Sequence, residues 1–154
     1  MARFPKPFNW KPINPKKYAG DVSKIISRSS WETRLFSYLD KNPSVLLWNS
    51  EDFIIKYISP IDGQYHNYHI DVIAKIKTKS GEEKTFAIEV KPAAQMVEPK
   101  PGPNKKSKVL LEQIETYQVN QAKWKAAKAF CEQKGISFIV LNEYDLGIEK
   151  RKSK

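Results

Sequence analysis

The chain has 154 residues, of which 40% are hydrophobic and 12% aromatic, and its net charge is +10. This length suits one domain with appended segments, and this composition excludes a disordered tail or a coiled coil. The lone Cys131 excludes an intramolecular disulfide, and no Cys/His spacing matches a zinc site. Without a signal peptide or an apolar run that could span a membrane, we expect a soluble protein that binds an acidic polymer.

Basic residues are concentrated in three segments. Residues 1–20 are expected to form a basic aromatic N-terminal arm, and residues 1–17 carry a charge of +5 without an acid. Residues 92–108 form a Pro/Lys-rich loop with a charge of +3, and residues 147–154 form a basic C-terminal tail. Such arms are typical of proteins that follow a phosphate backbone, although Lys-rich termini are often merely solvated.

Helix and strand patterns fill residues 21–146, the predicted domain. A helix is predicted from Ser29 to Lys41, where Asn42-Pro43 ends it. An apolar run from Val45 to Trp48 leads to a strand over 53–58, followed by a turn at Asp62-Gly63. The buried stripe of the helix is expected to contain Trp31, Leu35, Tyr38 and Leu39.

Two alternating strands follow, over 69–77 and 83–91. Gly81 suits the left-handed position of a three-residue loop between them. A long helix is predicted over 108–134, and an apolar strand over 136–141 should pair in parallel with an earlier strand. The fold class is therefore α/β, with a mixed sheet and the order helix, three strands, helix, strand. The apolar faces are expected to contain Ile70, Val72, Ala74 and Ile76 in one strand, Phe86, Ile88 and Val90 in the next, and Val119, Ala122, Ala126, Ala129 and Phe130 in the long helix.

Asp71 and Glu89 are symmetric about position 80, the centre of the loop between the two strands. They should therefore face each other across the hairpin, away from the apolar face. Like charges placed directly opposite destabilise a sheet, so a compensating cation is expected. Mg²⁺ fits two carboxylates and a backbone carbonyl, for which that of Val90 is the candidate.

Lys91 follows Glu89 by two residues and so emerges on the same face. Its ammonium would orient the attacking water and steady the charge that develops on a phosphate. This pattern predicts metal-dependent phosphodiester hydrolysis. A salt-bridged hairpin surface without catalysis remains the alternative.

Glu32 and a stripe on the long helix admit two interpretations each. Ser29-x-x-Glu32 is a capping box, which would explain Glu32 without catalysis, but its carboxylate could also add a ligand to the metal site. A polar and aromatic stripe on the long helix either lines the cleft or forms a partly exposed flank; it contains Gln113, Tyr117, Asn120 and Trp124. We expect His66 and His69 to be exposed hairpin residues rather than metal ligands.

These positions carry motifs that resemble those of the PD-(D/E)xK nuclease superfamily. They are Ser29-Ser30-Trp31-Glu32, Ile70-Asp71, Ile88-Glu89-Val90-Lys91 and Gln113-x-x-x-Tyr117. Ile70 stands where the name of the superfamily has proline. Other motifs resemble more closely those of the head completion nucleases of T-even-type tailed bacteriophages, which are related to the Tn7-type transposition endonuclease. These motifs include Arg28-Ser29-x-Trp31-Glu32, Trp48-x-Ser50-Glu51 and Lys123-Trp124-Lys125-Ala126-Ala127.

The resemblance implies a restriction-endonuclease-like core that uses Mg²⁺ or Mn²⁺. It implies catalysis by Glu32, Asp71, Glu89 and Lys91, supported by Gln113 and Tyr117, with the metal on Asp71, Glu89, the Val90 carbonyl and Glu32. The expected DNA contacts are Lys16, Lys17, Arg28, Lys105, Lys106 and Lys123.

The same resemblance implies action on packaged DNA ends during head completion and head–tail joining. The expected partners are DNA and phage head, portal or neck proteins, and the expected location is the host cytoplasm or the virion. A non-catalytic head protein that binds DNA or the portal, and a transposition or junction-type endonuclease, remain alternatives.

Overall fold

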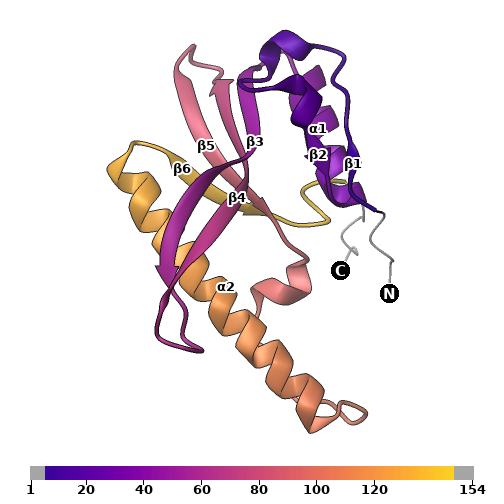
Figure 1. Ribbon diagram of the computed structural model, residues 1–154, viewed down its shortest axis with the longest axis vertical. Coiled ribbons are helices and arrows are strands. Elements are labelled where there is room, and N and C mark those ends of the chain that lie inside the picture. The colour runs from indigo at the N-terminus through magenta and orange to yellow at the C-terminus, as the bar shows by residue number, and fades with distance from the viewer. Residues whose placement is uncertain (1–5, 148–154) are drawn as a thin grey trace.

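The computed structural model describes residues 6–147, except for the side chains of residues 51 and 52 (Figure 1). The predicted tail falls almost entirely outside this range. Short 3₁₀ turns lie at Pro15–Lys17, Val22–Lys24 and Ala93–Met96. The helices and strands are β1 (Phe8–Asn9), β2 (Ile26–Ser27), α1 (Ser30–Lys41), β3 (Val45–Ile58), β4 (Tyr65–Lys77), β5 (Glu83–Val90), α2 (Ser107–Gln133) and β6 (Ser137–Leu141).

A mixed sheet organises the described part of the chain. Its strand order is β3-β4-β5-β6, antiparallel at the first two pairings and parallel between β5 and β6. The predicted element order and the parallel last strand are thus confirmed, and the mixed α/β fold is restriction-endonuclease-like. The parallel pairing follows from α2, which carries the chain back along the sheet so that β6 runs in the same direction as β5.

The two helices pack on opposite faces of the sheet. Val72, Ala74 and Ile88 share one apolar cluster with α1, whereas Ala87 shares another with α2. Because neighbouring residues of a strand point to opposite faces, Ile88 and Ala87 assign the two faces to the two helices. Figure 1 shows α2 crossing the sheet and extending well beyond it at its N-terminal end.

An irregularity in β3 changes the direction of the β3–β4 ribbon. Ser50 pairs with Val72 and Phe53 with Ile70, so residues 51 and 52 together face Asp71. Such a bulge increases the local twist. On one side of this bulge Val72 packs in the cluster with α1, and on the other side Ile70 packs in the cluster with α2. The expectation that Ile70 and Val72 share one packing face is therefore wrong.

The first helix begins as predicted. Ser29 is its N-cap and accepts a hydrogen bond from the Glu32 N–H at 3.1 Å. The buried stripe differs at two positions, because Trp31 is only half-buried and Tyr38 is 57% exposed, whereas Phe36 is fully buried. Phe36 packs against Trp48 with ring centroids 5.2 Å apart, and this aromatic contact turns the helix toward that side.

The long helix packs on the sheet through four of its five predicted apolar residues, Val119, Ala122, Ala126 and Phe130. Its buried residues are Asn120, Ala127 and Cys131, whereas the predicted core residue Ala129 is exposed. The polar and aromatic stripe with Asn120 and Trp124 therefore lies against the sheet. No helix in the described part of the chain is long and apolar enough to cross a bilayer.

From residue 6 onward the N-terminal arm is fastened to the domain rather than free. The buried carboxylate of Asp40 accepts hydrogen bonds from the N–H groups of Ile13 at 2.8 Å and Asn14 at 2.9 Å. The Lys17 ammonium donates to the carbonyls of Leu39, Asp40 and Asn42 at the end of α1. These three bonds use all its protons and interact favourably with the helix dipole, so Lys17 is a helix cap rather than the expected DNA contact.

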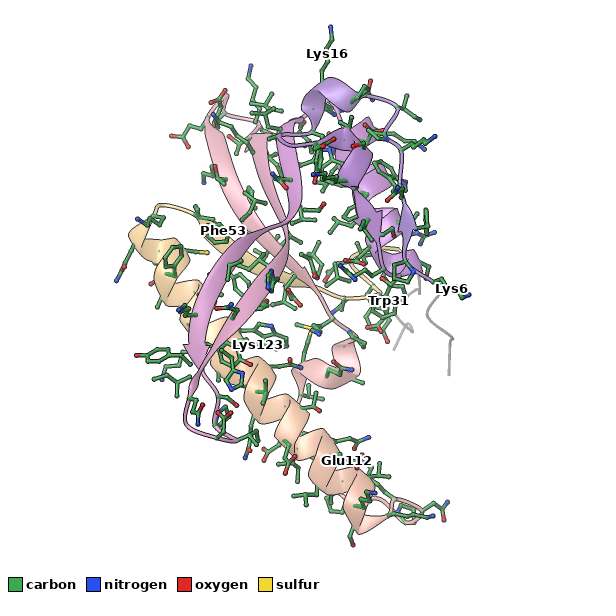
Figure 2. All side chains as sticks on the ribbon, in the orientation of Figure 1. Lys6, Lys16, Trp31, Phe53, Glu112 and Lys123 are labelled. Atoms are coloured by element: carbon green, nitrogen blue, oxygen red, sulfur yellow. The ribbon has the colours of Figure 1, made fainter. Side chains whose placement is uncertain are left out.

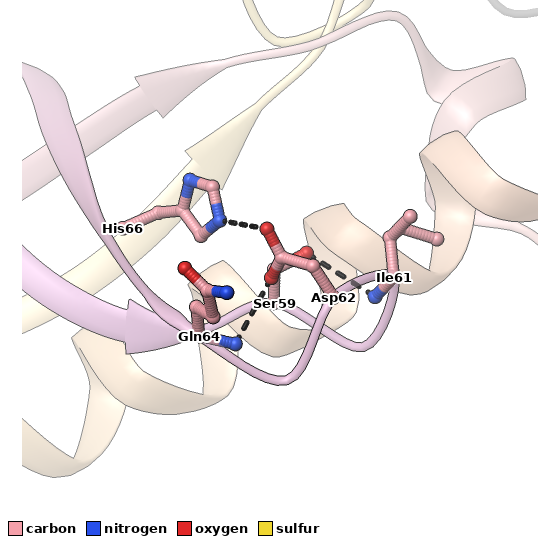
Figure 3. A network of polar contacts seen from close by, with 5 residues as sticks. All are labelled: Ser59, Ile61, Asp62, Gln64 and His66. Atoms are coloured by element: carbon pink, nitrogen blue, oxygen red, sulfur yellow. Dashed lines mark hydrogen bonds and ion pairs between the residues drawn. The ribbon is translucent and has the colours of Figure 1, made fainter.

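The β3–β4 hairpin closes through its own side chains (Figure 3). Asp62 accepts hydrogen bonds from the Gln64 N–H at 2.9 Å and His66 Nε2 at 2.7 Å, and the Ser59 hydroxyl accepts one from the Ile61 N–H. These bonds lower the Asp62 pKa, first through Gln64 and then through His66. Gly63 supplies the left-handed backbone, with φ at 69°, that the turn requires. His66 is thus an exposed residue of the hairpin, as expected.

Candidate active site

Asp71 and Glu89 lie side by side on neighbouring strands. Val72 pairs with Ile88, and one step further along the ladder Asp71 faces Glu89. The Val90 N–H donates to Asp71 Oδ2 at 2.9 Å, which locks the two strands together at this point. The predicted pairing is therefore confirmed. Both residues share the face of Ala87 and Ile73, so they lie on the α2 side and away from the cluster around α1.

Glu89 is buried in this position, with 5% of its surface exposed. Its Oε2 accepts a hydrogen bond from the Tyr68 hydroxyl at 2.7 Å, and its Oε1 lies 3.9 Å from Lys91 Nζ. Burial, followed by repulsion from Asp71, raises the Glu89 pKa from 4.5 to about 8, although Tyr68, Lys91 and Lys123 act in the opposite direction. Burial therefore disfavours the charged form of Glu89 more strongly than the nearby ammonium groups favour it.

Lys123 is a second ammonium at this site. It reaches in from α2, with Nζ 5.5 Å from the ring centre of Tyr68 and 5.7 Å from that of Tyr57 (Figure 2). Burial and then repulsion from Lys91 lower the Lys123 pKa, whereas Glu89 and Asp71 raise it. Lys123 was expected among the DNA contacts of the surface. The structure instead places it half-buried, beside the acidic pair and close to Lys91.

The donor set of the acidic pair fits a hard divalent cation. Two carboxylates and the nearby carbonyl of Val90 supply oxygen ligands of the kind that Mg²⁺ prefers. Burial is the main cause of the raised Glu89 pKa and the charge of Asp71 the second, and a bound cation would counteract both. Among the side chains that the structure describes, which do not include those of residues 51 and 52, no three of His, Cys, Asp or Glu come close enough to hold a metal together.

Glu32 does not join this pair. Its Oε2 accepts a hydrogen bond from the Arg28 N–H at 2.7 Å, while its own N–H is bound by Ser29. The cap at Ser29 is thereby confirmed, but the return bond of Glu32 comes from the Arg28 N–H and not from that of Ser29, as a strict capping box requires. This bond accounts for a carboxylate that is only 7% exposed. The expectation that Glu32 completes a cluster of three acids is not met by the arrangement of the side chains.

Gln113 and Tyr117 line a groove of about 1080 Å³ between α2 and the 92–105 segment. Its lining begins at Pro92, directly after Lys91, and contains neither Asp71 nor Glu89. Lys100 and Lys105 in its wall are balanced by Glu98 and Glu112, so the groove is nearly neutral in charge. The structure thus places the two predicted supporting residues in this groove and not in contact with the acidic pair.

The remaining expected DNA contacts are spread over the surface. Lys16, Arg28 and Lys106 are exposed, whereas Lys105 donates a hydrogen bond to the Lys100 carbonyl at 2.7 Å. Figure 2 shows Lys16 at the opposite end of the molecule from Glu112, which lies near the start of α2. These cations therefore do not form a single patch.

Comparison with known proteins identifies the family. The model of the TnsA-like endonuclease N-terminal family matches residues 42–143. The chain belongs to this family. It is also 40% identical over 137 residues to a protein of Enterobacteria phage T4 named head completion nuclease, and the match covers 87% of this chain and 89% of that protein.

The family match covers the part of the chain that holds the acidic pair. Asp71, Glu89, Lys91 and Lys123 lie inside residues 42–143, whereas Glu32 precedes them. Sequence reasoning missed Tyr68 altogether and misplaced Lys123. Only the spacing of Lys123 from Asn120 and Ala127, at helical intervals of three and four, indicates that it shares their inward face.

Proposed function

We propose that this TnsA-like endonuclease is a metal-dependent deoxyribonuclease of the PD-(D/E)xK type, with Asp71, Glu89 and Lys91 as its catalytic residues. The observation that carries the proposal is the acidic pair of a buried Glu89 and a half-buried Asp71, with an ammonium 3.9 Å from Glu89. Strongly perturbed carboxylates beside a lysine are typical of catalytic sites. The reaction is attack of water on a backbone phosphorus, which breaks one P–O bond and transfers a proton to the leaving oxygen.

Each residue has a separate task in this proposal. Asp71, Glu89 and the Val90 carbonyl would hold Mg²⁺ or Mn²⁺, which polarises a phosphate oxygen and makes bound water more acidic. The Lys91 side chain is 30% exposed, so its ammonium can reach a phosphate from the buried end of the site. Lys91 orients the attacking water and stabilises the charge on the phosphate. Lys123 adds a second positive charge from the α2 side.

The biological setting is proposed from the phage T4 relative. That protein is named head completion nuclease and is similar over most of both chains. We assign this chain to the same step, in which packaged DNA ends are processed before the head joins a tail, in the host cytoplasm or the virion. Its partners are DNA and head, portal or neck proteins, and Lys16, Arg28, Lys105 and Lys106 are the proposed peripheral DNA contacts.

Removal of the metal tests the proposed chemistry. Linear double-stranded DNA should be cut in the presence of Mg²⁺ or Mn²⁺, and cutting should stop when EDTA is added and return with excess metal. Gel analysis of product lengths would measure this. Cutting that is unchanged in EDTA would exclude metal dependence, and DNA binding without cutting under all conditions would favour a non-catalytic head protein.

Glu32 is tested by a substitution that keeps its hydrogen bond. Glutamine can replace glutamate in a capping box because its amide oxygen also accepts from a backbone N–H. If Glu32 is a cap, Glu32→Gln should retain cleavage within about 3-fold and change the unfolding free energy by less than about 1 kcal/mol. If its charge serves catalysis, cleavage should fall by about 10²-fold with the melting temperature unchanged.

A further inference from the structure

The two oxygens of Glu89 have different partners. Oε2 accepts the hydrogen bond from the Tyr68 hydroxyl, which is buried with it, and Oε1 faces Lys91. A carboxylate on a two-carbon side chain is free to rotate unless hydrogen bonds fix it. Here a neutral donor on one side and a cation on the other determine the orientation of the group.

Tyr68 reaches Glu89 because one face of β4 meets both apolar clusters. The buried residues of β4 alternate without a break. Tyr68 and Ile70 belong to the cluster with α2, whereas Val72 and Ala74 belong to the cluster with α1. Because strands twist, the end of β4 that carries Tyr68 comes to the side of Glu89.

We propose that Tyr68 is a positioning residue of the active site, which holds Glu89 Oε2 so that Oε1 is presented to the cation and to Lys91. This inference rests on the proposed function. Residues that bind a metal ligand from behind fix its direction and typically contribute 10- to 100-fold in metal affinity or activity. Tyr68 stays a neutral donor for this purpose, because burial and then the charge of Glu89 raise its pKa far above the usual range of tyrosine.

Its surroundings hold Tyr68 in place. The Lys123 ammonium lies over the Tyr68 ring. The buried indole N–H of Trp124 lies near the Tyr68 oxygen and lowers the pKa of Tyr68, although this N–H forms no hydrogen bond of regular geometry. The ring is 3% exposed. Because the ring packs independently of the hydroxyl, Tyr68→Phe removes one hydrogen bond and keeps the rest of the contacts.

Tyr18→Phe is the matched control. The Tyr18 hydroxyl also makes a side-chain hydrogen bond, of 2.9 Å to Ser50 Oγ, and its ring packs on Trp48 in the cluster on the α1 side. The two substitutions therefore remove the same chemical group from a packed ring. Only one of these groups contacts Glu89.

The experiment measures Mg²⁺ and Mn²⁺ affinity by calorimetry, the kcat and KM of DNA cleavage at saturating metal, and DNA affinity in Ca²⁺. For Tyr68→Phe we expect metal affinity to fall about 10- to 100-fold and kcat to fall in the same range, with KM and DNA affinity within about 2-fold of wild type. Tyr18→Phe should match the wild type in all four quantities.

Two results would overturn the role of Tyr68 alone: a wild-type metal affinity in Tyr68→Phe, or an equal loss in Tyr18→Phe. A wild-type protein that neither binds metal nor cuts DNA would instead overturn the proposed function. If Tyr68→Phe does not fold, NMR of the wild type decides the matter. The ring signals of Tyr68 should shift when Mg²⁺ is added to the wild type and should not shift in Glu89→Gln. If the wild type binds Mg²⁺ and these signals do not change, Tyr68 does not position the metal ligand.

Discussion

Asp71→Asn is expected to reduce DNA cleavage by at least about 10³-fold, because it removes one of two carboxylates that hold the cation. The fold should survive. The amide oxygen of asparagine can still accept the 2.9 Å hydrogen bond from the Val90 N–H. The measurement is the rate of cleavage of linear DNA at saturating Mg²⁺, together with the melting temperature of each protein.

Asp62→Asn is the control for Asp71→Asn. Asp62 accepts hydrogen bonds from Gln64 and His66 at the exposed hairpin turn, outside the acidic pair. The same change of charge at Asp62 should leave the cleavage rate within about 2-fold of the wild-type rate, since substitutions at the surface and away from the active site usually have small effects. Equal rates in the wild type and Asp71→Asn would remove Asp71 from the reaction and leave a DNA-binding role for the protein.

Glu89→Gln is expected to stop cleavage while it stabilises the metal-free protein at high pH. The Glu89 pKa is about 8 in the folded protein against an ordinary value of 4.5, so between these values the folded state binds more protons than the unfolded state. Stability therefore falls as the pH rises from about 4.5 to about 8. Glutamine has no such proton to lose, and at pH 8 the variant should exceed the wild type by on the order of 2 kcal/mol in unfolding free energy.

Denaturant unfolding in EDTA at pH 5, 6, 7 and 8 measures this difference. It should be small at pH 5 and grow toward pH 8. The control is Glu83→Gln on the same strand, whose carboxylate forms an exposed pair with Lys75 at 3.3 Å and should contribute less than about 1 kcal/mol at any pH. A difference that shrinks as the pH rises would contradict the assignment.

Added Mg²⁺ should reverse the order of stability. A ligand at 100 times its dissociation constant stabilises the folded state by about 2.7 kcal/mol, and Glu89→Gln would forgo most of this gain. The acidic pair thus makes the protein less stable without metal and more stable with it. This dependence is the expected cost of placing two carboxylates on adjacent strands.

The sequence pattern was sufficient for the parts of the site that depend on local geometry. Asp71 and Glu89 could be paired because a short loop determines the register of a hairpin, and the cap at Ser29 could be read because its motif spans four consecutive residues. Lys17 shows that composition alone does not reveal what a basic side chain binds. Its positive charge indicated DNA, but the three carbonyls at the end of α1 that bind it lie more than twenty residues away in the chain.

The amino-acid sequence by itself determined the order of helices and strands, the pairing of the acidic residues and the position of Lys91 beside them, because these depend on alternation and on short turns. Only the tertiary structure decided which other residues complete the site. Tyr68 reaches Glu89 through the twist of β4 between the two apolar clusters, and Lys123 lies on the side of α2 that faces the sheet. Both depend on how distant segments pack, and packing is set by the shapes of side chains on two faces of the sheet rather than by any one segment.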